Sequence, residues 1–299
     1  MKIIVTGSLG HISKLLTEEL VGKGHSVTVV SSKAERQKDI EALGAKAAIG
    51  TMADADFLAM SFAGADAVYC MLSTGGSYSD QNLDPMAYAS KVANNYKHAI
   101  RQSGVKRVVN LSSIGAHTNK GNGLLAFYYD VENILNTLPS DVGITFMRPV
   151  GFYQNLLGFI NAIKTQGVIA SNYGGDDKKP WVSPIDIAAA VAQEITTPFV
   201  GRKVRYVASE EITCNEIASI LGAAIGKPDL KWIVIPDEQL LKGMIAAGMN
   251  PRVAAGLVEM NASSHTGKLY EDYHRNRPVL GKVKMKDYAK EFARVYNQK

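Results

Sequence analysis

Short apolar runs alternate with helical patterns through the first half of the 299-residue chain. Continuous apolar runs of this length are typical of strands buried on both faces of a parallel sheet. The runs cover residues 3–5, 27–30, 47–49, 67–71, 105–111 and 144–147. The helical patterns between them cover residues 12–20, 34–43, 56–62, 85–102 and 126–138. This alternation predicts right-handed β-α-β units and an α/β fold of the Rossmann type, with a doubly wound parallel sheet.

The pattern changes after Pro149. We expect, in order, an amphipathic helix at 152–164, a polar loop at 166–180, a helix at 184–195 and a strand at 204–207. The remainder is mostly helical, with one apolar strand at 232–235. We therefore predict two domains. Residues 1–150 and 181–208 form the Rossmann domain, and residues 151–180 and 209–299 form a smaller, mostly helical domain.

The composition limits the class of protein. Hydrophobic residues make up 46% of the chain and charged residues 20%, which excludes a disordered chain and a collagen-like repeat. The two cysteines, Cys70 and Cys214, form no C-x-x-C pair and no zinc spacing, and no histidine has metal-ligand spacing, so we expect no metal. Such cysteine usage favours a reduced, cytoplasmic protein. No stretch reaches the ~18 apolar residues of a membrane span.

The net charge of +5 is concentrated near the C-terminus. Residues 264–299 contain nine Lys or Arg and four Asp or Glu. A basic face can attract nucleic acid, but we find no DNA-reading motif, and the cations alternate with Val, Met, Tyr and Phe. We favour a solvated terminal helix over a nucleic-acid site.

A glycine-containing turn follows the first apolar run, at residues 6–13 (TGSLGHIS). Gly7 permits a tight turn, and Gly10 lets the backbone approach a ligand closely. The exposed N–H groups and the positive dipole of the following helix suit a pyrophosphate. Its position between strand and helix favours a dinucleotide site over a turn without a ligand.

The end of the second strand distinguishes the two nicotinamide dinucleotides. An acidic residue there would bind the ribose 2′-hydroxyl of NAD(H). This chain has Ser31, Ser32 and Lys33 instead, with Arg36 one turn further on. Hydroxyl groups and two cations suit a 2′-phosphate, so we favour NADP(H) over NAD(H). The alternative is that Lys33 and Arg36 are merely exposed cations.

Four segments carry a wider resemblance. They are residues 5–10 (VTGSLG), 104–113 (GVKRVVNLSS), 145–155 (TFMRPVGFYQN) and 181–188 (WVSPIDIA). Together they resemble the NmrA-like branch of the atypical short-chain dehydrogenase/reductase (SDR) superfamily over most of residues 1–208. The resemblance implies that the Rossmann domain binds NAD(P)(H) at the carboxyl ends of its strands. It also implies that the smaller domain binds substrate and closes over a cleft.

The same resemblance assigns residues to the cofactor. The pyrophosphate would contact Gly7, Leu9, Gly10, His11 and Ile12. The adenosine ribose or its phosphate would contact Ser32, Lys33 and Arg36. A loop passing the cofactor ribose would contain Leu72, Ser73 and Thr74. The nicotinamide would lie near Ser112 and Ser113, in a pocket lined by Pro149, Val150 and Phe152.

The chain departs from the family at three points. Ser13 stands where a glycine is usual, and Thr51 stands where many relatives have an aspartate. None of the 13 tyrosines has a lysine four residues later, so the Tyr-x-x-x-Lys pair is absent. Alignment on Glu132 places Leu124 in the tyrosine position and Tyr128 in the lysine position. Leu124 cannot transfer a proton.

These features favour an oxidoreductase that passes a hydride directly to a small organic acceptor such as a quinone. Ser113 and Tyr128 are the candidate catalytic residues, and Tyr129, Tyr153 and His117 are weaker alternatives. A protein that binds NADP(H) without turnover and acts as a redox-responsive regulator is the second hypothesis. The oligomeric state, monomer or homodimer, is left open.

Overall fold

The structure is a computed structural model and describes residues 1–73 and 75–298. Its centre is a seven-stranded sheet in the order β10-β6-β5-β4-β1-β2-β3, in which all neighbours are parallel. The strands are β1 (Lys2–Val5), β2 (Ser26–Ser31), β3 (Lys46–Ile49), β4 (Ala67–Cys70), β5 (Arg107–Leu111), β6 (Gly143–Pro149) and β10 (Arg202–Val207). The predicted Rossmann-type α/β fold is confirmed.

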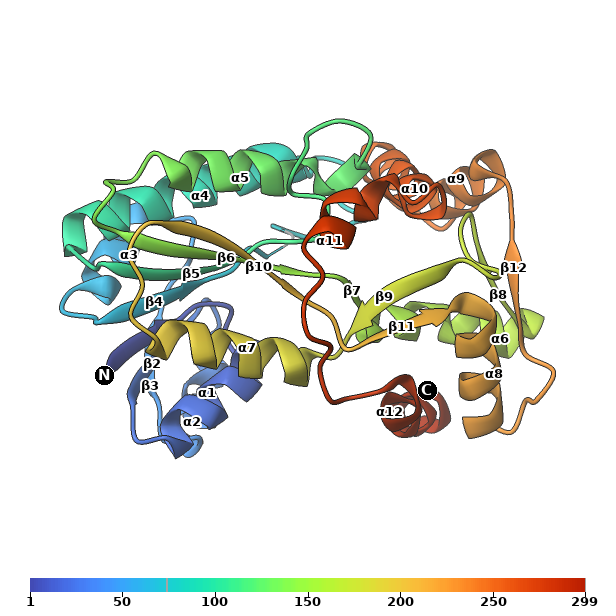
Figure 1. Cartoon of the computed structure of the whole chain (residues 1–299), viewed down its shortest axis with the longest axis horizontal. Helices are drawn as coiled ribbons and strands as arrows, with labels where there is room; N and C mark the ends of the chain where they lie inside the picture. Colours follow the sequence, from blue (N-terminus) through green and yellow to red (C-terminus); the bar gives the residue numbers. More distant parts are fainter. Residues whose placement is uncertain (74, 299) are drawn as a thin grey trace.

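Helices cover both faces of this sheet (Figure 1). One layer contains α3 (Ala55–Phe62), α4 (Pro85–Ser103) and α5 (Ala126–Asn136). The other contains α1 (Ser13–Gly22), α2 (Gln37–Ala42) and α7 (Pro184–Thr196). The strand order reverses between β1 and β4, and the carboxyl ends of strands at such a switch point border a crevice where ligands bind.

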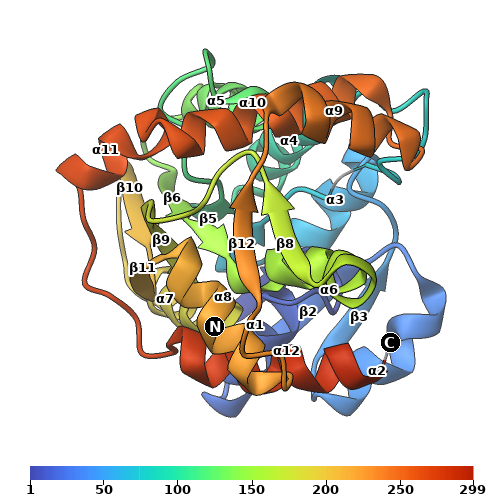
Figure 2. The same ribbon diagram turned by 90° about the vertical axis from the view of Figure 1, so that its right-hand side faces the viewer.

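A second group of elements adjoins the carboxyl ends of the sheet (Figure 2). A three-stranded sheet has the order β11-β9-β7, from Glu210–Thr213, Lys178–Val182 and Gly151–Phe152. A parallel pair joins β8 (Val168–Ser171) to β12 (Lys231–Val234). The helical segments are η3 (Tyr153–Phe159), α6 (Ile160–Gln166), α8 (Cys214–Ala224), α9 (Asp237–Ala246), α10 (Pro251–His265), η4 (Lys268–Tyr270), α11 (Glu271–Arg275) and α12 (Met285–Gln298).

The prediction of a loop over residues 166–180 was wrong. That segment contains β8 and the start of β9. Each strand is stabilised by a partner distant in sequence, because Val168 pairs with Lys231 and Lys178 with Thr213. The predicted helix at 152–164 is also divided, since the chain first forms β7, then the 3₁₀ turn η3, then α6. A local pattern does not reveal such pairing.

One hydrophobic cluster covers the large sheet and extends to η4 and α11, and another lies within the second group of elements. Buried residues of β1, α1 and α7, among them Leu16 and Val191, form one cluster on the large sheet. Another joins η3, α8 and α12, with Tyr153 and Phe292 fully buried. β9 crosses residues 180 and 181, where we expect the domain boundary. The division into two domains stays a prediction.

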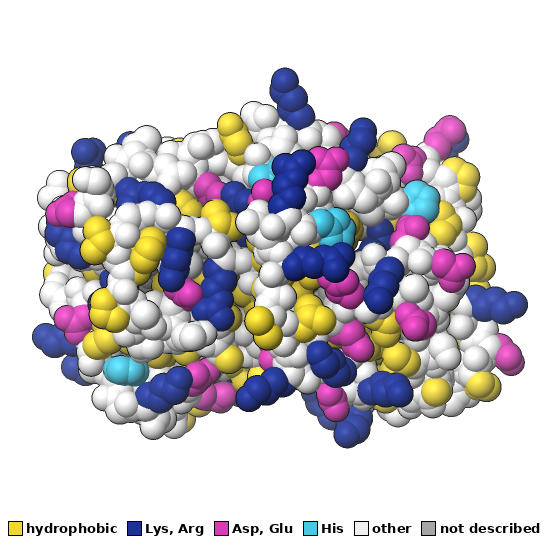
Figure 3. Space-filling model, viewed as in Figure 1, with side chains coloured by type: hydrophobic (Ala, Val, Ile, Leu, Met, Phe, Trp, Pro, Cys, Tyr) yellow, Lys and Arg dark blue, Asp and Glu magenta, His cyan; other side chains and the backbone are white. Residues whose placement is uncertain are grey.

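Charged side chains of both signs are interspersed over the face seen in Figure 3. Lys164 of α6 lies over the ring of Tyr296 of α12, with its Nζ 4.8 Å from the centre of the ring.

Both cysteines are buried as free thiols. Over residues 1–73 and 75–298, none of the helices combines the length and apolar character needed to cross a bilayer.

Candidate functional site

The turn between β1 and α1 adopts an unusual backbone conformation. Gly7 has a φ of +93° and Ser8 a φ of +55°. A Cβ on Gly7 would lie 2.7 Å from Ser13 Oγ and 2.8 Å from Met71 Cγ, so a side chain does not fit. Ser13 is buried, and its hydroxyl donates to the carbonyl of Thr6 at 2.8 Å. This hydrogen bond gives a reason for serine at position 13, where the family usually has glycine, because the hydroxyl links the start of α1 to the end of β1.

Unpaired amides meet at the start of α1. Within the described part of the chain, the backbone N–H groups of His11 and Ile12 have no hydrogen-bond partner. They lie at the positive end of a ten-residue helix, which favours an anion. Free amides and a turn without room for a Cβ fit the pyrophosphate of a dinucleotide.

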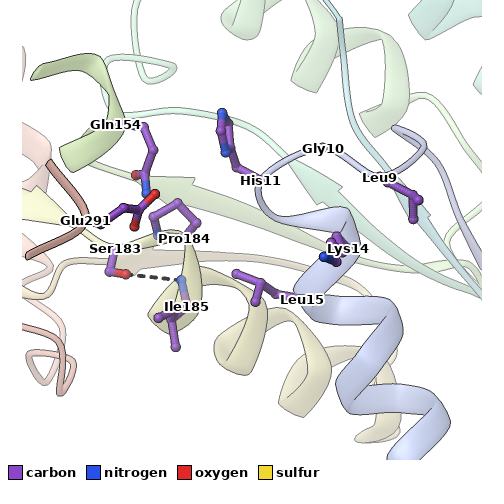
Figure 4. Close-up of a pocket in the computed structure, with 10 residues that line it drawn as sticks. All are labelled: Leu9, Gly10, His11, Lys14, Leu15, Gln154, Ser183, Pro184, Ile185 and Glu291. Atoms are coloured by element: carbon purple, nitrogen blue, oxygen red, sulfur yellow. Dashed lines mark hydrogen bonds between the residues drawn. The ribbon is translucent and has the colours of Figure 1, made fainter. Parts of the chain in front are cut away.

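A groove of about 390 Å³ opens beside this turn. Figure 4 shows Leu9, Gly10, His11 and Lys14 on one side of it and Ser183, Pro184 and Ile185, at the start of α7, on another. The Ser183 hydroxyl accepts a hydrogen bond from the amide of Ile185 at 3.2 Å. Gln154 from η3 and Glu291 from α12 complete the lining, so the second group of elements reaches the turn.

A cavity of about 190 Å³ lies on the other side of the turn, between the ends of β1, β2 and β4. It is lined by Gly7, Ser8, Ser31, Ser32, Thr51, Met71, Ser73 and Tyr88, among others. The Ser8 hydroxyl donates to that of Ser31 at 2.9 Å, which connects the turn to the end of β2. The small hydroxyl side chains leave room for an adenosine ribose.

Lys33 and Arg36 are exposed and do not line this cavity. Arg36 contacts Asp39 at 3.3 Å on the same helical segment. A bound 2′-phosphate would therefore have to draw Arg36 away from a solvated ion pair. Thr74, assigned above to the cofactor loop, lies outside the described residues.

Most of the remaining predicted cofactor residues surround a cavity of about 270 Å³ at the ends of β4, β5 and β6. Its lining includes Gly10, His11, Ile12, Tyr69, Leu72, Ser112, Ser113, Tyr128, Pro149 and Phe152. The hydroxyl of Tyr69 is buried here without a hydrogen-bond partner among the described residues. Such an orphaned polar group points to a ligand or water in the cavity.

Beneath this cavity lies a buried network that the sequence analysis did not predict. Ser112 Oγ donates to Glu132 Oε1 at 2.5 Å. Arg148 binds the same carboxylate with two hydrogen bonds, at 2.9 and 2.6 Å. Its other amino group contacts Tyr206 at 3.2 Å and Asp272 at 3.1 Å. The network holds Ser112 through Glu132 and connects β6 to α11. The available signal was Arg148, a charged residue directly after the apolar run 144–147.

The two candidate catalytic residues differ in what they can do. Burial raises the pKa of Tyr128 to about 12, which makes it a weak proton donor. Ser113 lines the cavity without an acid or base bound to it among the described side chains. Leu124, in the family's tyrosine position, packs with Leu83 and Val253.

The weaker candidates lie apart from these cavities. The Tyr153 hydroxyl donates to the Val283 carbonyl at 3.3 Å inside a hydrophobic cluster. Burial lowers the pKa of His117, whose Nδ1 has no partner among the described residues. Neither residue lines the cavity at the strand ends.

A third cavity, of about 240 Å³, lies between the large sheet and the second group of elements. Ser113, Tyr128 and Phe152 line both this cavity and the one at the strand ends, so the two adjoin. Val150, predicted to contact the nicotinamide, lines this third cavity instead. Its other walls include Tyr173, Lys179, Trp181, Ser264 and Tyr270. The sequence analysis did not identify Lys179 as a site residue, because the segment 166–180 has the composition of a loop.

Comparison with known proteins places these features in a family. A model of the NAD(P)H-binding family matches residues 7–198. An NAD(P)H azoreductase from Xenophilus azovorans is 26% identical over 261 residues, 87% of this chain and 86% of the relative.

Two solved structures share the fold. An NADPH-dependent quinone oxidoreductase from Escherichia coli, complexed with NADPH, superimposes with a TM-score of 0.78 at 19% identity, covering 97% of this chain and 99% of that one. A triphenylmethane reductase from Citrobacter sp. gives a TM-score of 0.75 at 20% identity and covers 98% of this chain and 100% of that one.

Proposed function

Because the chain belongs to the NAD(P)H-binding family, we propose that it is an NADPH-dependent oxidoreductase of the NmrA-like, atypical SDR type that reduces a small organic acceptor such as a quinone. One observation carries the proposal. The cavity at the strand ends and the third cavity meet at Ser113, Tyr128 and Phe152. A nicotinamide ring in the first would face an acceptor in the second.

The chain's own residues would position the cofactor. The free amides of His11 and Ile12 would bind the pyrophosphate, and Ser31 and Ser32 would face the adenosine ribose. Ser112, held by Glu132, would lie beside the nicotinamide. When bound, the reduced nicotinamide supplies a hydride. Close positioning of donor and acceptor is then the main contribution of the protein.

The missing Tyr-x-x-x-Lys pair restricts the acceptor. Leu124 is buried among apolar side chains and cannot activate a hydroxyl group. Acceptors that take up a hydride readily, such as quinones and azo compounds, do not require that pair. The printed names of an NAD(P)H azoreductase and of a quinone oxidoreductase, both similar to this chain, agree with this class.

A panel of quinones and azo compounds with NADPH tests the proposal. We expect acceptor-dependent oxidation of NADPH, together with cofactor binding measured by calorimetry. Tight cofactor binding without turnover on any acceptor would contradict the enzyme and favour the redox-responsive regulator. The absence of binding to either nicotinamide dinucleotide would contradict both.

The preference for NADPH rests on Lys33 and Arg36. Both are exposed beside the cavity at the end of β2, and Arg36 would leave its ion pair with Asp39 to approach a 2′-phosphate. We expect Lys33→Ala with Arg36→Ala to weaken NADPH binding by about tenfold or more, because hydrogen bonds to charged groups contribute about 1.5–3 kcal/mol each. NADH binding should be unchanged. Exposed Lys38, on α2, provides the matched control as Lys38→Ala. Equal losses for both cofactors would contradict the assignment.

A further inference from the structure

A lysine is buried in the wall of the third cavity. Lys179 lies on β9, with only 2% of its surface exposed. Its Nζ donates to the Ser264 carbonyl at 2.6 Å and to the Ser264 hydroxyl at 2.9 Å. The rings of Tyr173 and Tyr270 lie near the ammonium, with their centres 5.2 and 5.7 Å from Nζ. All four of these residues line the cavity proposed for the acceptor.

A second group in the same wall also requires a partner. Trp181, two residues further along β9, lines the cavity. Its indole N–H is buried and has no hydrogen-bond partner among the described residues. Buried donors of this kind are normally satisfied by a ligand or by water. Lys179 and Trp181 therefore place a cation and an unpaired N–H donor in the lining of one cavity, which suits a ligand with an electron-rich oxygen or nitrogen.

The ammonium also has a route to solvent. Asp177 Oδ2 lies 3.7 Å from Lys179 Nζ, and its side chain is 30% exposed. The same oxygen is hydrogen-bonded to Nδ1 of His265, which is exposed. Asp177 thus connects a buried amine to groups that exchange protons with water.

We propose that Lys179 is the proton donor of the reaction, an inference that rests on the proposed function. The acceptor gains two electrons and a hydrogen as a hydride from the reduced nicotinamide. The N–H bond of the Lys179 ammonium breaks, and an O–H bond forms on a quinone oxygen, or an N–H bond on an azo nitrogen. The neutral amine then regains a proton from solvent by way of Asp177.

The surroundings of Lys179 make its ammonium a stronger acid than that of an exposed lysine. Burial lowers the pKa of Lys179, and the Asp177 carboxylate partly opposes this effect. The other titratable groups around it are the thiol of Cys214, the phenols of Tyr173 and Tyr270, and His265 through Asp177. Burial raises the pKa of Cys214 to about 12, so its thiol is neutral. Asp177 is thus the carboxylate that favours the charged form of the amine against the effect of burial.

Two substitutions of Lys179 distinguish the loss of its acidic proton from the loss of its positive charge. Lys179→Met removes the proton, whereas Lys179→Arg keeps the charge but holds its proton too tightly to donate it. Both should lower kcat for quinone reduction by about 100-fold, the usual contribution of a positioned acid. NADPH affinity should be unchanged, because Lys179 lies outside the cofactor cavities. The exposed neighbour Lys178, changed to Met, is the control and should keep full activity.

Asp177→Asn provides a test that does not depend on losing the lysine. Removal of the carboxylate should lower the pKa of Lys179 further. In the cofactor-free protein, NMR of ¹³C-labelled lysine should show one amine titrating below the ordinary range. That amine should shift to lower pH in Asp177→Asn and vanish in Lys179→Met. The alkaline decline of kcat should move to lower pH in parallel.

The outcomes separate two kinds of failure. If the unmodified protein reduces no quinone or azo compound, the proposed function fails, and the role of Lys179 with it. If it turns over but Lys179→Met retains its kcat, only the donor assignment is wrong. Recovery of kcat in Lys179→Arg would show that charge alone matters and would also overturn the assignment. An amine that titrates in the ordinary range, unmoved by Asp177→Asn, would contradict it without any turnover measurement.

Discussion

At the scale of single residues, the turn after β1 depends on Gly7 and Ser13. Gly7 adopts a left-handed conformation that L side chains rarely adopt, against the side chains of Ser13 and Met71. A glycine at position 13 would have no side chain, whereas Ser13 has a hydroxyl that donates a hydrogen bond to the Thr6 carbonyl. The hydroxyl satisfies a backbone acceptor inside the protein.

We expect Gly7→Ala to lower the free energy of unfolding by about 1–3 kcal/mol, because strain at a positive φ is added to a close contact. The new methyl group would also displace Ser13 or Met71 and reduce NADPH affinity. Gly22→Ala in α1 is the control. A Cβ there meets nothing within 4 Å, so we expect a gain of up to about 1 kcal/mol. Urea unfolding and calorimetry measure both effects. Unchanged stability and affinity in Gly7→Ala would show that the turn adapts.

At the scale of elements, Glu132 and Arg148 join α5 to β6 beneath the site. Their side chains are 7% and 8% exposed, and two hydrogen bonds connect them. Burying two charges is costly, and a close pair regains that cost only with good geometry. The Ser112 hydroxyl donates a hydrogen bond to Glu132, and Ser112 lines the proposed cofactor cavity. The Glu132–Arg148 pair therefore orients a side chain of that cavity.

We expect Arg148→Met to destabilise the protein by about 3–5 kcal/mol, because it leaves the Glu132 carboxylate buried and unpaired. The double change Glu132→Leu with Arg148→Met should recover most of that loss, since neither charge then remains. Urea unfolding of both single variants and the double variant provides the cycle. A double variant as unstable as the sum of its single changes would contradict a paired role.

At the scale of the whole molecule, the site lies where the large sheet meets the second group of elements. Bonds between distant parts of the chain define this junction. Arg148 on β6 reaches Asp272 on α11 across this junction. Within the second group, Lys179 on β9 reaches Ser264 on α10. Gln154 and Glu291 approach the same groove from η3 and α12. The proposed acceptor pocket therefore exists only in the assembled molecule, whereas the turn at Gly7 is built by neighbouring residues.

The sequence by itself determined the parallel sheet and the turn. Each of these follows from residues close together in the chain, through apolar runs, glycine spacing and helix starts. Tertiary structure decided β8, β9 and β11, because their partners lie far away in sequence. It also decided the places of Lys179, Trp181 and Glu132. Their roles depend on burial and on contacts with residues distant in the sequence, and local residue spacing predicts neither.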